Sequence, residues 1–380
     1  MSANAKVTTG YSQQTNSDAA VKEVLEALRG MEPSLVVFFA STDHDVPAIA
    51  AELKKAFPSS VVTGCTTAGE LISGPGCLNK SLVVMALPKQ VILRAEGVLI
   101  ENLNENATKA GDFLRELAKR WGQDVRSLDP NRFVGLVLPD GLSLQEESLM
   151  DALGDAAPDL LVVGGSAGDD LQFKGTQVAL GDKAVGNAAA LLLLEVGVPY
   201  RAIKNSHFVP TEKTFIATRV DEATRTIFEF DGRPAVEAYA EALGLTPADI
   251  NVGVMAANPI GLVIGDDPFV RSFQQIGDQG EMRLYSNVLS GSEVTLLKGG
   301  DMVKTTRTLI EGVEKDLGKL SGALTFNCIL RWVEAENLGC TQEVYSVLGE
   351  KRIPAIGFQT YGEQYLGHIN QTVTMLCFGE

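Results

Sequence analysis

The sequence predicts an α/β protein built from two related domains with mixed sheets. Three observations support this fold class: apolar runs alternate with amphipathic segments, one seven-residue pattern occurs twice, and glycine is abundant, with 38 copies in 380 residues. A chain of this length is expected to form two domains. Its 45% hydrophobic and 21% charged residues are typical of a protein with a full apolar core.

The first half of the chain alternates strand and helix patterns. Continuous apolar runs predict buried strands, and apolar residues spaced three and four positions apart predict helices. Strands are expected at 35–40, from 60–63 onward, and at 81–86, 133–138, 160–163 and 188–194, with helices at 19–29, 46–57, 107–121 and 144–156. Such alternation is typical of an α/β domain with partly buried sheets.

The second half begins with a hairpin and ends as a strand–helix–strand–strand series. The expected elements are strands at 215–220 and 226–230, a helix at 234–243, several strands, and a helix at either 292–297 or 306–317. We place the domain boundary near residue 220, which gives one domain at residues 1–220 and a second at 221–380.

An internal repeat links the two halves. The pattern G-x-x-T-x-G-E occurs at residues 64–70 and again at 357–363, and the similarity continues between 78–85 and 369–376. A weaker third copy at 166–169 reads S-A-G-D. We therefore expect a repeated strand–helix–strand–turn–strand module and a common origin for the two halves.

The residues of this pattern suit a tight turn. Glycine permits a left-handed backbone or a close approach of two backbones. Thr67 with Glu70, and Thr360 with Glu363, can bond the free N–H groups of such a turn. Two interpretations stay open: a purely structural turn, or a turn whose N–H groups and threonine hydroxyl face a ligand.

These motifs resemble the FIST family of sensory domains. The resemblance rests on the segments GCTTAGE (64–70), PDGLS (139–143), VVGGSAGDD (162–170), FEFDGRPAVEAYAEALG (228–244), FNCILR (326–331) and IPAIGFQTYGEQYLGHINQTVTML (353–376). It covers most of the chain and implies an N-terminal and a C-terminal FIST domain. It also implies a small-molecule sensor that acts in signal transduction without catalysis.

One segment resembles a particular branch of the FIST family. Residues 205–210, NSHFVP, are similar to a stand-alone bacterial branch of the family associated with haem and nitric oxide sensing, whose members act on histidine kinases. This similarity implies haem b as cofactor, nitric oxide as the diatomic signal and a histidine kinase as partner. His207 is then the expected iron ligand and Phe208 part of the haem pocket. Nitric oxide would weaken the iron–imidazole bond and shift the two domains.

The other histidines are weaker candidates for the iron. His368 follows the second G-x-x-T-x-G-E turn and is the alternative axial ligand, although a structural or ligand-contacting role suits it better. His44 stands at an expected helix start and should face solvent. No C-x-x-C-H motif for covalent attachment is present. Ligation by tyrosine or cysteine stays open.

An amino-acid-like molecule is the rival ligand. A zwitterion needs donors for its carboxylate and a carboxylate for its ammonium group. The candidate donors are Thr67, Thr360 and Arg331, and the candidate acceptors are Glu70, Glu363 and Asp140. Each also has a structural interpretation as a turn or surface residue. For Arg331 this is an ion pair with Glu363 or Glu343.

An enzyme is a distant alternative. Residues 164–168 satisfy the G-x-S-x-G pattern of a hydrolase nucleophile, with Ser166 as nucleophile and His207 or His368 as base. However, no helical pattern follows directly and no H-G-G-G segment is present. The chain also lacks a G-x-x-x-x-G-K-S/T phosphate-binding loop. We therefore expect a non-catalytic protein.

Charge and hydropathy restrict the partners and location. A net charge of −16 and the lack of a basic run disfavour nucleic acid and anionic membranes. The longest apolar stretch, 188–194, is much shorter than the about 20 residues of a membrane-spanning helix. Residues 1–16 have no apolar signal-peptide core and are expected to form a loose tail. Five cysteines without a C-x-x-C pair suggest free thiols in the cytoplasm. The oligomeric state stays open.

Overall fold

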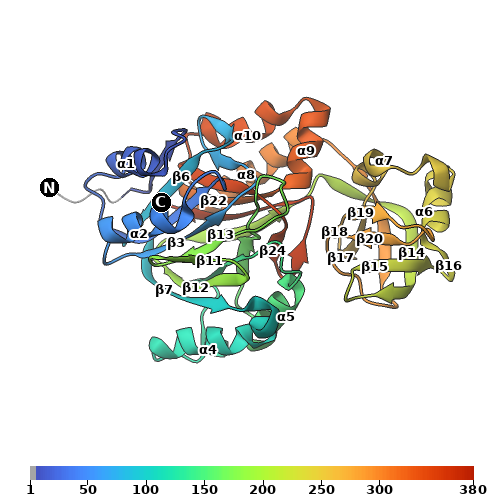
Figure 1. Cartoon of the computed structure of the whole chain (residues 1–380), viewed down its shortest axis with the longest axis horizontal. Coiled ribbons are helices and arrows are strands. Elements are labelled where there is room, and N and C mark those ends of the chain that lie inside the picture. Colours follow the sequence, from blue (N-terminus) through green and yellow to red (C-terminus); the bar gives the residue numbers. More distant parts are fainter. Residues whose placement is uncertain (1–5) are drawn as a thin grey trace.

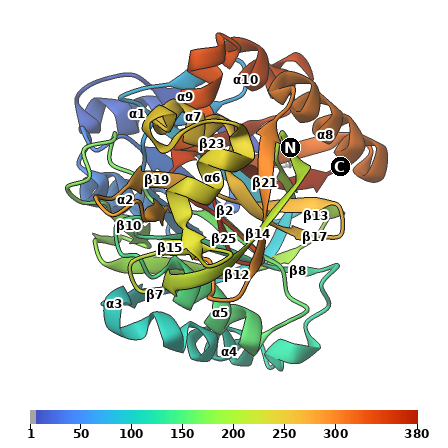
Figure 2. The same ribbon diagram turned by 90° about the vertical axis from the view of Figure 1, so that its right-hand side faces the viewer.

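The computed structural model describes residues 6–380 and confirms the α/β class with mixed sheets (Figure 1). Residues 6–207 and 300–380 form one body, here called the core. Residues 208–299 form a separate β-rich body, here called the inserted unit, which lies at one end of the core (Figures 1 and 2).

The core contains three copies of one module, each a strand, one or two helices, a strand, one or two helices, a strand, a short hairpin and a last strand. The first contains β1 (Thr8–Ser12), α1 (Ser17–Ala27), β2 (Pro33–Ala40), α2 (Val46–Ala56), β3 (Val61–Thr66), β4 (Glu70–Ile72), β5 (Gly76–Leu78) and β6 (Leu82–Pro88). The second contains β7 (Ile92–Glu101), α3 (Leu103–Asn106), α4 (Ala110–Arg120), β8 (Phe133–Pro139), α5 (Glu146–Ala156), β9 (Val162–Gly165), β10 (Val178–Leu180), β11 (Lys183–Val185) and β12 (Ala188–Val196). The third contains β13 (Tyr200–Asn205), α8 (Met302–Leu317), β22 (Leu320–Cys328), α9 (Ile329–Leu338), α10 (Thr341–Glu350), β23 (Ala355–Thr360), β24 (Glu363–Tyr365), β25 (His368–Ile369) and β26 (Val373–Gly379).

The three modules exchange their hairpins in a cycle. The four long strands of each module make one sheet, in the orders β1-β6-β2-β3, β7-β12-β8-β9 and β13-β26-β22-β23. Hairpin β10–β11 extends the first sheet next to β3, β24–β25 extends the second next to β9, and β4–β5 extends the third next to β23. No module is complete without a strand pair from another.

The glycine that begins the repeated pattern explains how each parallel pair packs. A Cβ atom on Gly64, Gly164 or Gly357 would lie 2.2, 1.8 or 2.0 Å from the carbonyl oxygen of the residue opposite it in the preceding strand of its module. The three glycines are therefore equivalent. With Gly64 equivalent to Gly164, Thr67 corresponds to Ala167 and not to Ser166. The third copy expected at residues 166–169 is therefore displaced by one position.

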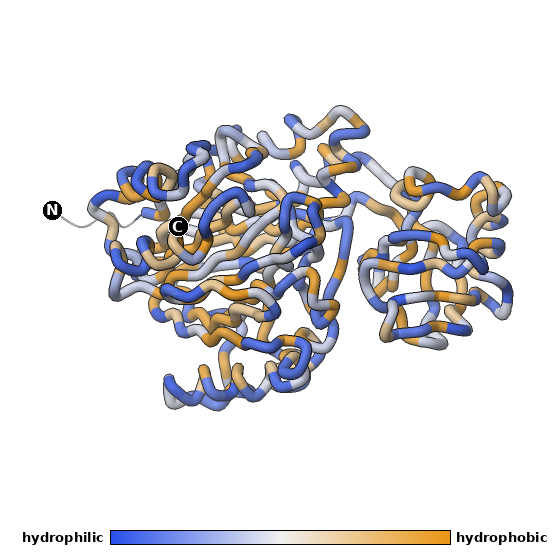
Figure 3. Tube along the Cα trace, in the orientation of Figure 1, coloured by the Kyte–Doolittle hydropathy of each residue, from blue (hydrophilic) through white to orange (hydrophobic). Residues whose placement is uncertain are grey.

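The inner faces of the three sheets share one apolar core, and helices cover the outer faces. Phe39 from the first module contacts Phe326 and Phe358 from the third, with ring centroids 6.2 and 4.6 Å apart. Helices α1 and α2 cover the first sheet, α4 and α5 the second, and α8 and α10 the third. Figure 3 shows apolar residues along the core strands and polar residues on the outer helices.

The inserted unit interrupts the third module between β13 and α8. Its sheet has the order β18-β17-β21-β14-β15-β20-β19, with β16 beside β15. Its elements are β14 (Phe208–Asp221), β15 (Thr226–Phe230), β16 (Arg233–Pro234), α6 (Ala235–Leu243), α7 (Val252–Ala257), β17 (Ile260–Ile264), β18 (Asp267–Arg271), β19 (Phe273–Ile276), β20 (Met282–Leu284) and β21 (Glu293–Gly299). It has an apolar core of its own.

Most expected elements are confirmed, with corrections at two places. Residues 293–297 lie in strand β21, so the helix expected at 292–297 or 306–317 is α8. The tail expected at 1–16 contains strand β1, which pairs with β6, and its first five residues lie outside the described ones. The boundary near residue 220 falls at the end of β14 and stays a prediction. Within residues 6–380, no helix is both long and apolar enough to span a membrane.

Candidate functional site

The two G-x-x-T-x-G-E turns are held by their own buried carboxyl groups. Glu70 accepts hydrogen bonds from the Thr67 hydroxyl and from the N–H and hydroxyl of Ser81, the latter two at 3.1 and 2.6 Å. Glu363 accepts the N–H and hydroxyl of Thr372 at 3.1 and 2.6 Å. Burial raises the pKa of Glu70 to about 7 and that of Glu363 to about 8.

The turns of the three modules also bond one another. The Ala68 N–H donates to the Gln359 carbonyl at 3.1 Å, and the Ser166 N–H donates to the Gly362 carbonyl at 2.8 Å. The Thr360 hydroxyl donates to the Ser166 carbonyl at 2.8 Å. The N–H groups of Ala68 and Ser166 and the Thr360 hydroxyl, which could have faced a ligand, therefore join the modules.

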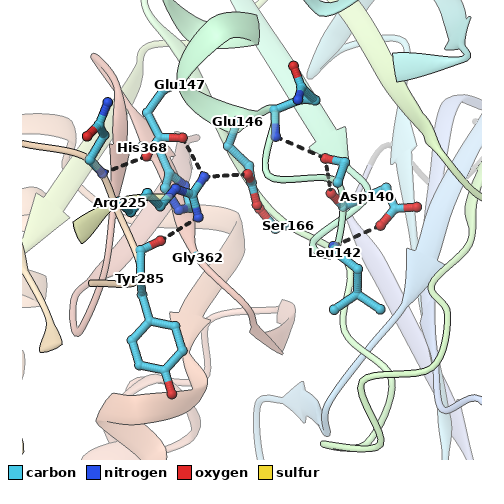
Figure 4. Close-up of polar contacts among 12 residues, drawn as sticks. Asp140, Leu142, Glu146, Glu147, Ser166, Arg225, Tyr285, Gly362 and His368 are labelled. Atoms are coloured by element: carbon cyan, nitrogen blue, oxygen red, sulfur yellow. Dashed lines mark hydrogen bonds and ion pairs between the residues drawn. The ribbon is translucent and has the colours of Figure 1, made fainter. Parts of the chain in front are cut away.

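Asp140 has the corresponding role in the second module. Its carboxylate accepts the Leu142 N–H at 2.8 Å, the Thr176 hydroxyl at 2.6 Å and the Asn187 N–H at 2.6 Å (Figure 4). Asp140 directly follows β8 and accepts the Asn187 N–H just before the last strand of its module, as Glu70 and Glu363 accept N–H groups in theirs. The weak third copy therefore needs no glutamate. Thr67, Glu70, Asp140, Thr360 and Glu363 thus lie in structural turns, and none of them lines the cleft described next.

A cleft of about 330 Å³ lies between the core and the inserted unit. Four large apolar side chains on its core side are exposed: Leu144 at 59%, Leu171 at 43%, Phe173 at 58% and Val333 at 37%. The volume and mainly apolar lining are typical of a small-molecule pocket. The other residues that line it are Gly141, Leu142, Glu146, Ala223, Thr224, Arg225, Gln274, Arg283, Leu284, Tyr285, Ile329, Leu330 and Tyr361.

The loop after β9 supplies the aromatic wall of the cleft. The Asp169 carboxylate accepts the N–H groups of Phe173, Lys174 and Gly175 at 2.9, 2.6 and 3.0 Å, and the Tyr361 hydroxyl at 2.5 Å. The Phe173 ring stacks on Tyr361 with centroids 5.2 Å apart. Burial opposes ionisation, but these hydrogen bonds hold the pKa of Asp169 below its ordinary value.

The same loop has an unusual backbone. Asp170, Leu171 and Phe173 have φ angles of +53°, +61° and +53°, in the left-handed region that residues other than glycine rarely adopt. The Asp170 carboxylate fixes the loop to the first module by accepting the Ser41 hydroxyl at 2.9 Å and the Thr42 hydroxyl at 2.8 Å. Backbone strain of this kind is concentrated at functional sites.

Arg225 joins the inserted unit to the core at one edge of the cleft (Figure 4). Its guanidinium donates to Glu146 at 2.9 Å, to Glu147 and to the Tyr285 carbonyl at 2.7 Å. The Asn287 N–H donates to Glu147 at 2.8 Å. Two carboxylates on α5 of the core therefore hold two loops of the inserted unit.

The cleft also contains a cation without an ion-pair partner among the described residues. Arg283, on β20 of the inserted unit, makes one hydrogen bond, from Nε to the Thr224 carbonyl at 3.3 Å. Sequence reasoning singled out the loops at 139–143 and 162–170 but missed Arg225, Arg283, Phe173 and Tyr361. One sequence feature could have indicated Phe173: no helical pattern follows the G-x-S-x-G segment at 164–168, so a long loop is expected after β9.

His368 and Ser166 lie buried beneath the Arg225 contact (Figure 4). Gln364 bridges them: its Nε2 atom is 3.0 Å from Ser166 Oγ and 3.2 Å from His368 Nδ1. Burial lowers the pKa of His368. Ser166 Oγ is also 3.5 Å from Glu146. Among the described residues no histidine hydrogen-bonds to Ser166.

His207 lies where the chain enters the inserted unit. Its imidazole is fully buried, and Nε2 is 2.9 Å from the Glu334 carboxylate. Its carbonyl accepts the Gly300 N–H at 2.9 Å, so the entering and leaving segments meet here. Phe208 packs on Val270 and Leu297.

The two ring nitrogens of His207 have different surroundings. Nε2 is held by Glu334, whereas Nδ1 is buried without a hydrogen-bond partner among residues 6–380, and the adjacent Phe208 is enclosed in apolar contacts of the inserted unit. Within residues 6–380, no group of three or more His, Cys, Asp or Glu side chains could hold a metal ion.

Arg331 lies away from the cleft. It is 1% exposed and donates to Asn327 Oδ1 at 2.7 Å and to the Thr306 hydroxyl at 2.6 Å. Among residues 6–380 its side-chain hydrogen bonds go to these two neutral groups, and the expected ion pair with Glu363 or Glu343 does not form; Glu363 bonds Thr372 instead.

Comparisons with known proteins identify the family. Residues 34–233 match the FIST N domain and residues 235–366 match the FIST C domain, which are sensory domains that bind small ligands in signal transduction. A comparison with curated proteins finds no match. A crystal structure of a chorismatase aligns over 98% of each chain at 7% identity with a TM-score of 0.33, a likeness too weak to support any inference. The chain belongs to the FIST family.

Proposed function

We propose that this protein is a cytoplasmic, non-catalytic sensor whose small ligand binds in the cleft between the core and the inserted unit. The observation that carries the proposal is the cleft itself, lined by exposed apolar side chains of a strained core loop and by Arg283 of the inserted unit, which has no ion-pair partner within residues 6–380. A ligand there touches both bodies of the protein.

The lining favours an amphipathic anion, and an amino acid with a large apolar side chain has the right chemistry. Its apolar part would pack against Phe173 and Leu144, and its carboxylate would pair with Arg283. Charge-assisted hydrogen bonds between arginine and a carboxylate are among the stronger polar contacts in proteins. The hypothesis of an amino-acid-like ligand is thus kept, but its proposed site is the cleft and not the buried G-x-x-T-x-G-E turns.

The signal would arise from a change in the position of the inserted unit. A ligand shifts an equilibrium only through unequal affinity for two arrangements, and a contact to both bodies provides that inequality. A tenfold change in partner affinity needs about 1.4 kcal/mol of coupling. The partner we propose is a separate histidine kinase, supported by the similarity of residues 205–210 to the stand-alone branch.

The test is calorimetric titration with leucine, phenylalanine and other amino acids. Phe173→Ala and Arg283→Met should each weaken binding at least tenfold. Arg233→Met removes an exposed arginine of the inserted unit that pairs with Glu241, and it should bind as the parent does. Saturable binding that neither Phe173→Ala nor Arg283→Met affects would exclude this cleft.

Kinase regulation needs a separate measurement. Autophosphorylation of a histidine kinase from the same organism would be recorded with the sensor alone and with sensor plus ligand. A ligand-dependent change that disappears with Arg283→Met supports the proposal. Equal autophosphorylation with and without the ligand would contradict it.

Haem-based nitric oxide sensing at His207 is the second candidate, and it rests on the sequence similarity of residues 205–210. The group would supply an iron that binds the diatomic gas, and His207 would hold it through Nδ1, or through Nε2 after release of Glu334. A sharp Soret band after hemin addition that shifts with nitric oxide and is lost in His207→Ala, but kept in His368→Ala, would establish it. A broad spectrum like that of free hemin would reject it.

A further inference from the structure

A second cavity lies inside the third module, between its sheet and helices α8 to α10. It has a volume of about 40 Å³. Arg331 lines it, and most of the other walls are aliphatic. The further polar residues of its lining are Ser73, Thr306, Thr325, Asn327 and Tyr345. No aspartate or glutamate is among its lining residues.

Arg331 is a buried cation with incomplete partners. Its Nε atom has no hydrogen-bond partner among the described residues, and its two other contacts are to the neutral oxygens of Asn327 and Thr306. The two nearby acidic groups are engaged elsewhere: Glu334 with His207, and Glu363 with Thr372. A buried charge without a counter-charge is costly, so proteins normally pair it.

A second polar atom in the cavity is also unpaired. The Thr325 hydroxyl, on β22, is buried without a hydrogen-bond partner among the described residues. A cationic donor and a hydroxyl donor thus line a space whose remaining walls are mainly aliphatic. This combination is suited to a group with an anionic end and a methyl or methylene end.

We propose that this cavity binds a short-chain monocarboxylate, such as acetate, with its carboxylate on Arg331 and Thr325. A water needs about 10–15 Å³ of such volume, so 40 Å³ accommodates about three water-sized groups, the size of two carboxylate oxygens and a methyl group. Leu71, Ile72 and Gly76 of the exchanged β4–β5 hairpin also line the cavity, so the ligand would tie the first module to the third. The site is independent of the cleft ligand.

The test is thermal unfolding in increasing sodium acetate, with sodium chloride at equal ionic strength as reference. We expect a saturable rise in melting temperature with acetate that exceeds the chloride effect, because a ligand that binds only the folded state stabilises it. Hexanoate should be too large to produce it. The rise should vanish in Arg331→Met and persist in Arg307→Met, which removes an exposed arginine on α8 that pairs with Glu350.

Thr325→Val keeps the test decisive even where Arg331→Met fails to fold. It removes a hydroxyl that has no partner, so the fold should tolerate it, while acetate affinity should drop about tenfold. NMR line broadening of ¹³C-acetate would report this affinity directly. An equal response to chloride, or no saturable response to either anion, would overturn the proposal.

Discussion

Replacing Arg225 by methionine should weaken the contact between the inserted unit and the core. The Arg225 side chain is 9% exposed, and its partners Glu146 and Glu147 are 2% and 24% exposed. Methionine fills similar space but leaves two carboxylates without a cation in a largely buried place. Breaking a buried ion pair from one side typically costs about 3–5 kcal/mol, and we expect a loss of that size in the free energy of unfolding.

Urea denaturation monitored by circular dichroism would measure this loss. Arg219→Met is the matched control, because Arg219 pairs with Glu229 in the same unit but is 58% exposed, and such pairs contribute under about 1 kcal/mol. The triple variant that combines Arg225→Met with Glu146→Gln and Glu147→Gln should recover most of the stability, since neither carboxylate is then left charged without Arg225.

Two results would refute the reasoning. The first is a cost for Arg225→Met no larger than that of the surface control. The second is a triple variant that is less stable than Arg225→Met, because additive losses would mean that packing, and not the unpaired charges, determines the cost.

Three further predictions follow from the turns and the cleft loop. Glu70 and Glu363 have pKa values of about 7 and about 8 in the folded protein, above the ordinary value of 4.5. The folded state therefore binds more protons than the unfolded state in this pH range, and the free energy of unfolding should fall as pH rises from about 4.5 to 8. Glu70→Gln should reduce this fall by roughly 3 kcal/mol in urea titrations at several pH values, and an unchanged pH dependence would contradict the assignment. Gly164→Ala should cost about 3 kcal/mol or more in thermal unfolding, since its Cβ would lie 1.8 Å from a carbonyl oxygen, whereas Gly154→Ala, with open space in α5, should be neutral or stabilising by up to about 1 kcal/mol. Asp169→Ala should release the loop that carries Phe173 and weaken cleft binding about tenfold by calorimetry, and full affinity would show that the loop geometry is not needed.

Many helices and strands could be predicted from the sequence. The apolar run at 35–40 and the spacing at 46–57 depend on neighbours within a few residues, and both elements formed as expected. The family motifs were equally local. The repeat was visible in the first and third modules because each keeps glycine, threonine and glutamate in one short segment.

The third copy was only partly visible because its chemistry is distributed differently. Gly164 keeps the close approach to the preceding strand, but Asp140, from the end of β8, supplies the carboxylate that Glu70 and Glu363 supply elsewhere. A residue in another strand can replace one in the motif, and such a replacement leaves no trace in the spacing of the motif itself.

The sequence by itself determined the α/β class, the repeated turn and the membership of the FIST family. Only the tertiary structure decided the threefold hairpin exchange, the inserted unit at 208–299, the cleft lined by Phe173 and Arg283, and the cavity beside Arg331. The physical reason is sequence separation: Phe173 and Arg283 line one cleft although more than a hundred residues separate them in the chain. Such contacts follow from how sheets and modules pack, which no local pattern specifies.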